Sequence, residues 1–99
     1  MAQHKIEIAK FENLAGKLRA IAHPMRVDII ELLVEKPMNV TQIYTHFKIF
    51  QAGASHHLNI LKTHGLISKR AEGKSMVYSV KKDALKQLVE CIDCLQQVK

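Results

Sequence analysis

The sequence has few of the residues that build an aromatic core. Its 99 residues include no tryptophan, two tyrosines and three phenylalanines. A core formed without large aromatic side chains must be mainly aliphatic, and a chain of this length has room for one such core. We therefore expect residues 1–99 to form a single domain. Any long apolar stripe that this core leaves uncovered should contact a partner.

Cysteine is also scarce, and long apolar runs are absent. The two cysteines, Cys91 and Cys94, both lie near the C-terminus, unlike the spaced cysteines that crosslink small secreted domains. The sequence has no apolar run of signal-peptide length near its start. It also lacks a stretch of the roughly 20 apolar residues that cross a membrane. We expect a soluble, cytoplasmic protein without a membrane partner.

Acidic residues are outnumbered by basic residues. Fifteen Lys and Arg against nine Asp and Glu give a formal net charge of +6, and no low-complexity tail concentrates this charge. A basic domain of otherwise ordinary composition favours a polyanionic partner. Charge alone does not distinguish nucleic acid from an anionic membrane surface.

Apolar residues recur at helical spacing through the first half of the chain, which predicts three helices. The first should end at His23, because the residue before Pro24 is disfavoured in the helical region. Pro24 can then open a second helix, which ends at the next proline. The third helix covers residues 39–47 and can be capped by Asn39 or Thr41. The residues of the second helix that should face inward are Val27, Ile30, Leu33 and Val34.

The second half of the chain predicts a helix, a hairpin and a last helix. After a bend at Lys48 and Ile49, a fourth helix should run from about Gln51 to His64, and Gly65 can adopt the left-handed conformation that ends it. Apolar residues then alternate on either side of the sequence AEGKS, which predicts a two-stranded hairpin. A helical pattern returns near Lys82. The inward residues of the fourth helix should be Ala54, Leu58 and Leu61.

The expected fold is mainly α-helical with a small β-hairpin, in the order α-α-α-α-β-β-α. Two consecutive helices joined by a short turn, the second followed at once by a hairpin, are the layout of a winged helix-turn-helix.

Three of the six histidines lie in the fourth helix, and their spacing argues against a metal site. Two histidines of one helix share a metal when they lie four residues apart on one face. His56 and His57 point about 100° apart, and His57 and His64 are about 10.5 Å apart along the axis. We expect His57 to be half-buried beside Leu58. We expect His64 to lie at the helix C-terminus, where a positive imidazole is favoured.

Polar residues form a stripe on the face of the fourth helix opposite its apolar residues. Amide, hydroxyl and imidazole groups near a helix N-terminus can contact base edges in a major groove, and a lysine further along can contact phosphate. Such a stripe can equally be an ordinary solvated surface. The basic hairpin that follows favours the first interpretation. The stripe comprises Gln51, Ser55, His56, Asn59 and Lys62, and the hairpin carries Lys69, Arg70 and Lys74.

Two stretches together resemble a known family. Residues 54–80 contain Ser-x-His-Leu-x-x-Leu, then Gly-Leu, then a hairpin whose second strand includes Tyr78. Residues 18–33, LRAIAHPMRVDIIELL, resemble the second-helix signature of the same family. Over about residues 14–80 the sequence is therefore similar to the ArsR/SmtB-type family of bacterial winged-helix repressors.

This resemblance implies a homodimeric transcriptional regulator that binds double-stranded DNA. It further implies that the regulator is a repressor and that the protein is not an enzyme. Residues 51–64 would form the recognition helix and residues 69–74 the wing. A two-fold dimer implies an inverted-repeat operator. A winged-helix protein–protein adaptor without DNA binding is the alternative, because fold does not fix function. The candidate DNA contacts are Thr41, Gln42, Gln51, Ser55, His56, Asn59, Lys62, Lys69, Arg70 and Lys74.

The sequence departs from the family pattern immediately before the recognition helix. Phe50 stands where the family often has a capping serine, and a phenyl ring cannot accept a hydrogen bond from the unpaired amide groups of the first turn. Gly53 in that first turn also lowers helix stability, by roughly 1 kcal/mol relative to alanine.

The last helix carries two apolar stripes, one of which has coiled-coil-like spacing. One stripe can pack on its own domain and the other on a second copy of the chain, together with the first helix. We therefore expect the terminal helices to form the dimer interface. The candidate interface residues are Phe11, Leu14, Leu18, Leu88, Cys91 and Leu95.

Cys91 and Cys94 allow three interpretations. A catalytic dithiol normally lies at a helix N-terminus, whereas this pair lies late in its helix beside Glu90 and Asp93, which disfavours thiolate. A redox switch or thiophilic-metal site across the two-fold axis is a second interpretation. The resemblance does not support it, because Asn39, Thr41 and Tyr44 occupy the family's third-helix thiol positions and no histidine follows His64. The third interpretation is apolar packing at the interface. The sequence identifies neither the operator nor an inducer.

Overall fold

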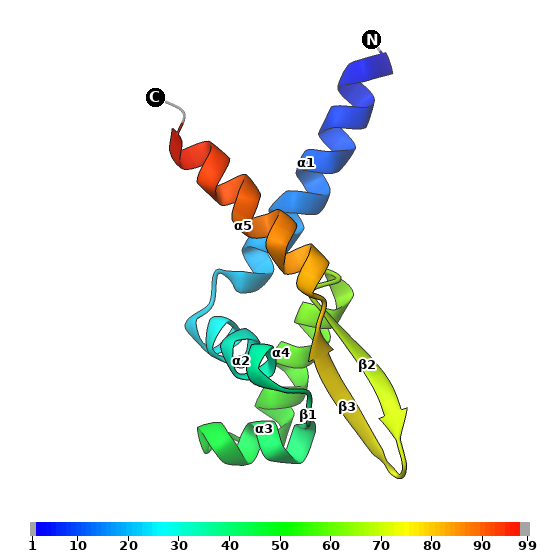
Figure 1. The fold of residues 1–99 in the computed structure, drawn as a ribbon, viewed down its shortest axis with the longest axis vertical. Coiled ribbons are helices and arrows are strands. Elements are labelled where there is room, and N and C mark those ends of the chain that lie inside the picture. The colour runs from blue at the N-terminus through cyan, green and yellow to red at the C-terminus, as the bar shows by residue number, and fades with distance from the viewer. Residues whose placement is uncertain (1, 98–99) are drawn as a thin grey trace.

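The computed structural model of the protein describes the backbone of residues 2–97 and the side chains of residues 8–93. Figure 1 shows a body formed by the central helices and the hairpin, from which the two terminal helices cross and extend on the same side. In chain order the elements are α1 (Ala2–Ile21), α2 (Pro24–Glu35), β1 (Met38–Asn39), α3 (Val40–Phe47), α4 (Gln51–Thr63), β2 (Ile67–Glu72), β3 (Ser75–Val80) and α5 (Lys82–Gln97).

Proline and histidine set the boundary between α1 and α2. His23 has extended backbone angles, with φ −150° and ψ 121°, and its Nδ1 accepts a hydrogen bond from the Met25 backbone N–H at 3.2 Å. Pro24 is the first residue of α2, where its missing N–H leaves no donor unsatisfied. The predicted break at His23 is confirmed, with α1 ending at Ile21.

The turn between α3 and α4 has one strong cap and one weak one. Asn39 caps α3 through a reciprocal capping box with Gln42, so the cap predicted at Asn39 or Thr41 is formed by Asn39. Lys48 ends α3 in the left-handed region at φ 55°. Phe50 occupies the N-cap of α4 and makes no side-chain cap bond, as the sequence predicts. At the other end of α4, Gly65 has φ 74° and Leu66 is 1% exposed.

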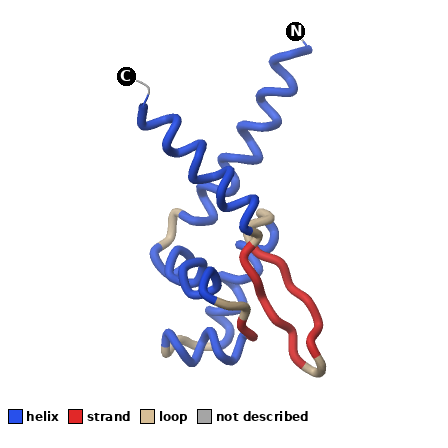
Figure 2. Tube along the Cα trace, in the orientation of Figure 1, coloured by secondary structure: helices blue, strands red, loops and turns tan. Residues whose placement is uncertain are grey.

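The sheet has three strands rather than the two predicted from the sequence. Figure 2 shows the β2–β3 hairpin as a long arm, with β1 beside β3. The strand order is β1-β3-β2, and Met38 pairs with Tyr78 while Asn39 pairs with Val77. Two residues are too few to display the alternation by which a strand is recognised. The short strand β1 exists only because the fold brings it against β3.

The buried face of α2 differs from the predicted one. Ile30 and Leu33 are buried as predicted, whereas Val27 is 38% exposed and Val34 is 46% exposed. Ile29, at 0% exposure, is buried instead. Because α2 contacts α1, α4 and β3, its packed face is rotated toward Ile29 relative to the single stripe that the spacing suggests. The prediction for Val27 and Val34 was therefore wrong.

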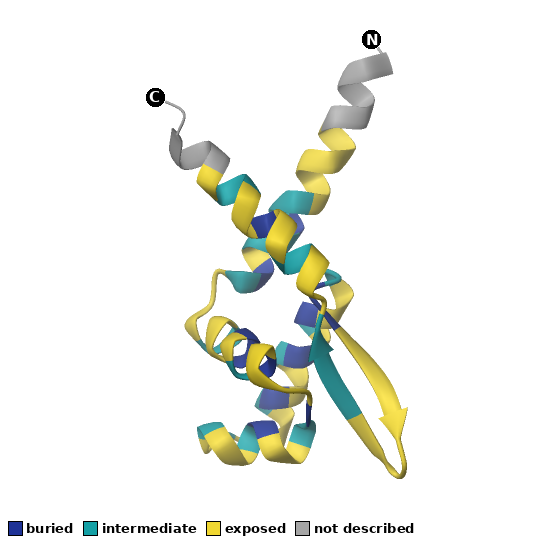
Figure 3. Cartoon of the chain, in the orientation of Figure 1, coloured by how far each residue is buried: buried dark blue, intermediate teal, exposed yellow. Residues whose placement is uncertain are grey.

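The core lies between α2, α3 and α4 and extends to the crossing of α1 with α5 (Figure 3). All three residues predicted to face inward from α4 are fully buried, and Leu88 of α5 is 1% exposed. Gly16 lets α1 approach the end of α4, since a Cβ at this position would lie 2.9 Å from Nδ1 of His64. This close packing fixes the terminal helices on the body that carries α4.

Candidate nucleic-acid interface

The polar stripe of α4 lies on the surface. Its members are all exposed, while Ala54, Leu58 and Leu61 on the opposite side of the same helix are 0% exposed. A helix that is anchored by one face and bare on the other can enter a groove without losing core contacts. We call this set of exposed residues the donor stripe; it comprises Gln51, Ser55, His56, Asn59 and Lys62.

The N-terminal end of α3 lies beside the hairpin. Thr41 and Gln42 are exposed, and Thr41 lines the same surface hollow as Lys69 and Lys74. Gln42 lines a neighbouring hollow with Arg70. Oε1 of Gln42 accepts the Asn39 backbone N–H at 2.9 Å, and this bond leaves the side-chain NH2 group available as a donor. The fold thus brings together candidate contacts that lie about thirty residues apart in the chain.

The hairpin, which we call the wing, presents cations on an exposed strand. All residues of β2 after Ile67 are exposed, and Gly73 forms the tip at φ 63°. Arg70 Nη2 lies 3.2 Å from Glu72 Oε2, with the two side chains 63% and 62% exposed. Such an exposed pair contributes little stability. Arg70 can therefore exchange Glu72 for a phosphate at small cost.

A cluster of His23, Arg26 and His57 lies behind the donor stripe. Arg26 Nε donates to His57 Nδ1 at 3.2 Å, and the His23 and His57 rings are 4.7 Å apart. Burial lowers the pKa of His57, and the charges of His23, Arg26 and His56 lower it further. His57 is half-buried, as predicted. The sequence analysis did not predict the contact between Arg26 and His57, because the two residues lie 31 positions apart and no local spacing links them.

The side chains that the structure describes form no group of three or more His, Cys, Asp or Glu placed to hold a metal. Cys91 is a half-buried free cysteine. The side chain of Cys94 lies outside the described residues, so the predicted thiol pair stays a prediction.

The terminal helices leave apolar side chains exposed. Phe11 is 66% exposed, Ile8 53% and Val89 49%, while Leu14 and Leu18 are partly buried against the core. Leu88 needs a correction, because it is only 1% exposed in the single chain and has almost no surface left for a partner. It packs in its own core, and its neighbour Val89 faces outward instead. The side chain of Leu95 lies outside the described residues.

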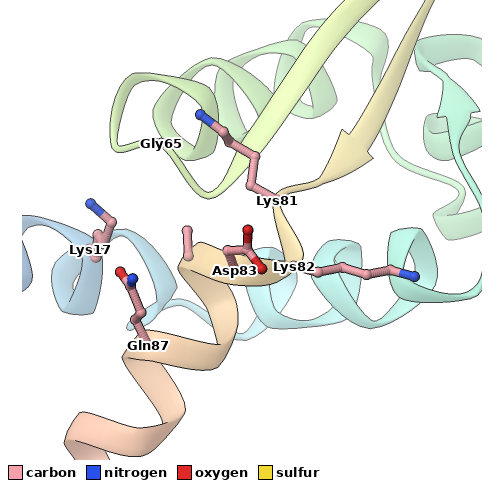
Figure 4. Close-up of a pocket in the computed structure, with 7 residues that line it drawn as sticks. Lys17, Gly65, Lys81, Lys82, Asp83 and Gln87 are labelled. Carbon is pink, nitrogen blue, oxygen red and sulfur yellow. The ribbon is translucent and has the colours of Figure 1, made fainter.

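The hollow where α1, the end of α4 and the start of α5 meet has a volume of about 490 Å³ and is lined by three lysines and Asp83. Figure 4 shows that the Lys17 and Lys82 side chains point away from each other. The cations do not converge on one point, so the hollow lacks the convergent polar groups of a ligand site.

Comparisons with known proteins place this arrangement in a family. Residues 23–69 match the family model described as bacterial regulatory protein, arsR family. The chain is 36% identical to the transcriptional repressor PagR of Bacillus anthracis over 95 residues, which cover 94% of each chain. It is also 36% identical to an uncharacterized HTH-type transcriptional regulator of Methanocaldococcus jannaschii, over 85% of this chain and 96% of that one.

A solved structure agrees with the sequence comparisons. The homodimeric winged helix-turn-helix DNA-binding domain of Mb0332 from Mycobacterium bovis superimposes with a TM-score of 0.78 at 25% identity. The match covers 92% of this chain and 85% of that domain. Within the described residues, none of the helices is long and apolar enough to cross a membrane.

Proposed function

The chain belongs to the arsR family of bacterial regulatory proteins, and from that premise we propose that it is a homodimeric repressor that binds an inverted-repeat operator through α4 and the wing. Its relatives are transcriptional regulators with winged helix-turn-helix domains, not enzymes.

The observation that carries this proposal is the donor stripe. Five adjacent polar side chains are exposed on a helix whose other face is fully buried. Gln51, Ser55 and His56 lie in the first half of α4, the part of a recognition helix that contacts base edges. Lys62 lies near its end, where it can contact phosphate. Thr41 and Gln42 of α3, together with the wing cations, extend the interface over the neighbouring backbone.

The apolar surfaces of α1 and α5 support the dimer. Phe11 and Val89 are exposed on helices that contact each other, at the end of the molecule opposite the wing (Figure 1). A two-fold interface between these helices would present two copies of α4 to successive major-groove faces. The operator should then contain two inverted half-sites about one helical turn apart.

We assign Cys91 to packing at this interface rather than to sensing. Its side chain is half-buried on α5, one of the two helices proposed to form the interface. Free cysteine commonly behaves as a small apolar side chain. DNA affinity measured with reduced and with oxidised dimer should be the same. A large difference between the two would instead support a thiol or thiophilic-metal response through Cys91 and Cys94.

Selection of duplexes from a randomised pool tests the function directly. We expect the protein to enrich an inverted repeat and to bind the selected duplex about 10³-fold or more tightly than a scrambled duplex. Its affinity should fall steeply with salt, because neutralised phosphates release counterions. Equal affinity for both duplexes would exclude the repressor and leave the adaptor.

Single substitutions in α4 sharpen this test. His56→Ala and Asn59→Ala should relax the preference at individual base pairs, each by about 1–3 kcal/mol, while affinity for the scrambled duplex changes little. Lys86→Ala on α5 is the control, because this exposed lysine is not among the candidate DNA contacts or the candidate dimer-interface residues. Unchanged base preference in both α4 variants would mean that α4 is not the recognition helix.

A further inference from the structure

Arg26 joins three helices that meet behind the donor stripe. Its Nη1 donates to the backbone carbonyl of Ala20 at the end of α1, at 3.2 Å, and its Nε donates to Nδ1 of His57 on α4, also at 3.2 Å. The bond to His57 is the one side-chain hydrogen bond from α4 to another helix in the part of the chain that the structure describes. Arg26 thus links its own helix, α2, to α4 and to the end of α1.

This bond can set the orientation of α4 in a way that apolar packing does not. Ala54, Leu58 and Leu61 hold α4 against the core, but hydrophobic contacts are not directional. The hydrogen bond from the planar guanidinium is directional. Its acceptor is His57, the neighbour in sequence of His56, and His56 belongs to the donor stripe. Base readout requires side chains held within about 10–20° of their productive geometry. A small rotation of α4 would therefore displace the donor stripe from the bases.

The bond exists only while His57 is neutral at Nδ1. A proton on Nδ1 would convert the acceptor into a donor facing the Arg26 N–H, and it would place two positive charges side by side. The charged and titratable groups that act on His57 are Arg26 of α2, His23 at the N-terminus of α2 and His56 of α4. Toward this cluster α1 presents the uncharged Ala20 carbonyl. No carboxylate is among the groups that act on His57, so nothing offsets the added charge.

We propose that Arg26 is a positioning residue for the recognition helix, acting through neutral His57, and that sequence-specific DNA affinity falls when His57 takes up a proton. The proposal rests on the proposed function, because it assumes that α4 reads the operator.

The direction of the pH effect follows from the shift of His57. Its pKa is lowered by burial and by neighbouring charges, so the unfolded chain binds more protons than the folded one between the folded value and the ordinary value of about 6.5. Stability is therefore fully present above about pH 6.5 and falls as the pH drops through that window. DNA binding that also requires neutral His57 should lose affinity in the same direction.

The experiment measures a specificity ratio, defined as the affinity for the selected duplex divided by that for the scrambled duplex. General charge effects, including protonation of the other histidines, strengthen binding to both duplexes and largely cancel in this ratio. For the wild type, we expect the ratio to fall between about pH 7.5 and about pH 5.5 by no more than about tenfold, because the pKa of His57 lies below the ordinary histidine value of about 6.5 and so less than one pKa unit above the lower pH. Circular dichroism at each pH verifies that the protein is folded.

Two variants separate positioning from simple stability. In His57→Asn, Oδ1 replaces Nδ1 as the acceptor and cannot take up a proton in this range. The ratio at about pH 7.5 should stay within about threefold of wild type and should be flat with pH. Arg26→Met should lower the ratio about tenfold at about pH 7.5, a loss of about 1.4 kcal/mol. Arg19→Met removes the same charge from an exposed site and should leave the ratio unchanged.

Each remaining outcome counts against one proposal. A wild-type ratio that is flat with pH, or His57→Asn that responds like wild type, would overturn the positioning role even if Arg26→Met failed to fold. If His56→Asn lost the pH response while His57→Asn kept it, the response would come from base contact by His56. This outcome would overturn the proposal as well. A wild type that never prefers the selected duplex would instead refute the proposed function.

Discussion

At the scale of single residues, Phe50 is the clearest departure from the expected pattern, because a helix N-cap favours a side chain that accepts a hydrogen bond. It is 88% exposed and gives α4 no side-chain cap. The missing cap was predicted from the sequence, because capping chemistry is local, whereas the exposure of the ring was not. Phe50→Ser should restore the missing acceptor and stabilise the protein by about 1 kcal/mol. For a domain of this size, the melting temperature should then rise by about 4–8 °C.

Phe50→Ala separates the cap from the loss of exposed apolar surface, because alanine removes the ring without adding an acceptor. Both variants must be melted at one protein concentration, since dimerisation makes the midpoint concentration-dependent. Equal melting temperatures for the serine and alanine variants would show that no cap forms at position 50.

His57 and Arg26 show the limit of prediction at this scale. The sequence indicated a half-buried His57 from its place beside Leu58, but it gave no sign of Arg26 as its partner. Spacing rules describe neighbours three or four residues apart on a helix. Contacts between helices depend on how those helices cross, and one sequence pattern permits several crossings.

At the scale of elements, the wing is the part whose function depends on charge rather than shape. Lys69, Arg70 and Lys74 lie on or beside an exposed strand, and of these three only Arg70 forms an ion pair among the described residues. Arg70→Ala and Lys74→Ala should weaken binding to selected and scrambled duplexes alike. Each should reduce the slope of log affinity against log salt by about 0.9.

Salt titrations of both duplexes measure these slopes, and Lys86→Ala again provides the control for loss of one positive charge. A wing substitution that changed base preference but not the salt slope would mean that the roles of the wing and α4 are reversed.

Helix boundaries were more predictable than packing faces. Pro24, Asn39 and Gly65 mark ends of helices through local backbone chemistry, and the structure has helix ends at each of them. The buried face of α2 was predicted incorrectly at Val27 and Val34, because three elements pack on that helix and the sequence shows only one stripe. A helix contacted from several sides has no single periodic signal.

At the scale of the whole molecule, the dimer decides whether the two copies of α4 can act together. Phe11→Asp places a charge on the largest exposed apolar residue of α1 and should convert the dimer to monomer, with loss of tight operator binding. Sedimentation velocity measures the mass, and an electrophoretic shift measures binding.

Val34→Asp is the matched control, because Val34 is 46% exposed on α2, which carries none of the candidate dimer-interface residues. This variant should stay dimeric and bind DNA. Dimers that persist in Phe11→Asp would place the interface elsewhere and would remove the reason to expect an inverted repeat.

The sequence by itself determined the order of the helices, the hairpin, the exposed donor stripe and the family, because periodicity, caps and turns are encoded by neighbours along the chain. Only the tertiary structure decided the pairing of β1 with β3, the burial of Leu88 in its own core and the bond between Arg26 and His57. These features join segments far apart in sequence. Their geometry depends on packing the whole chain at once, which no local pattern contains.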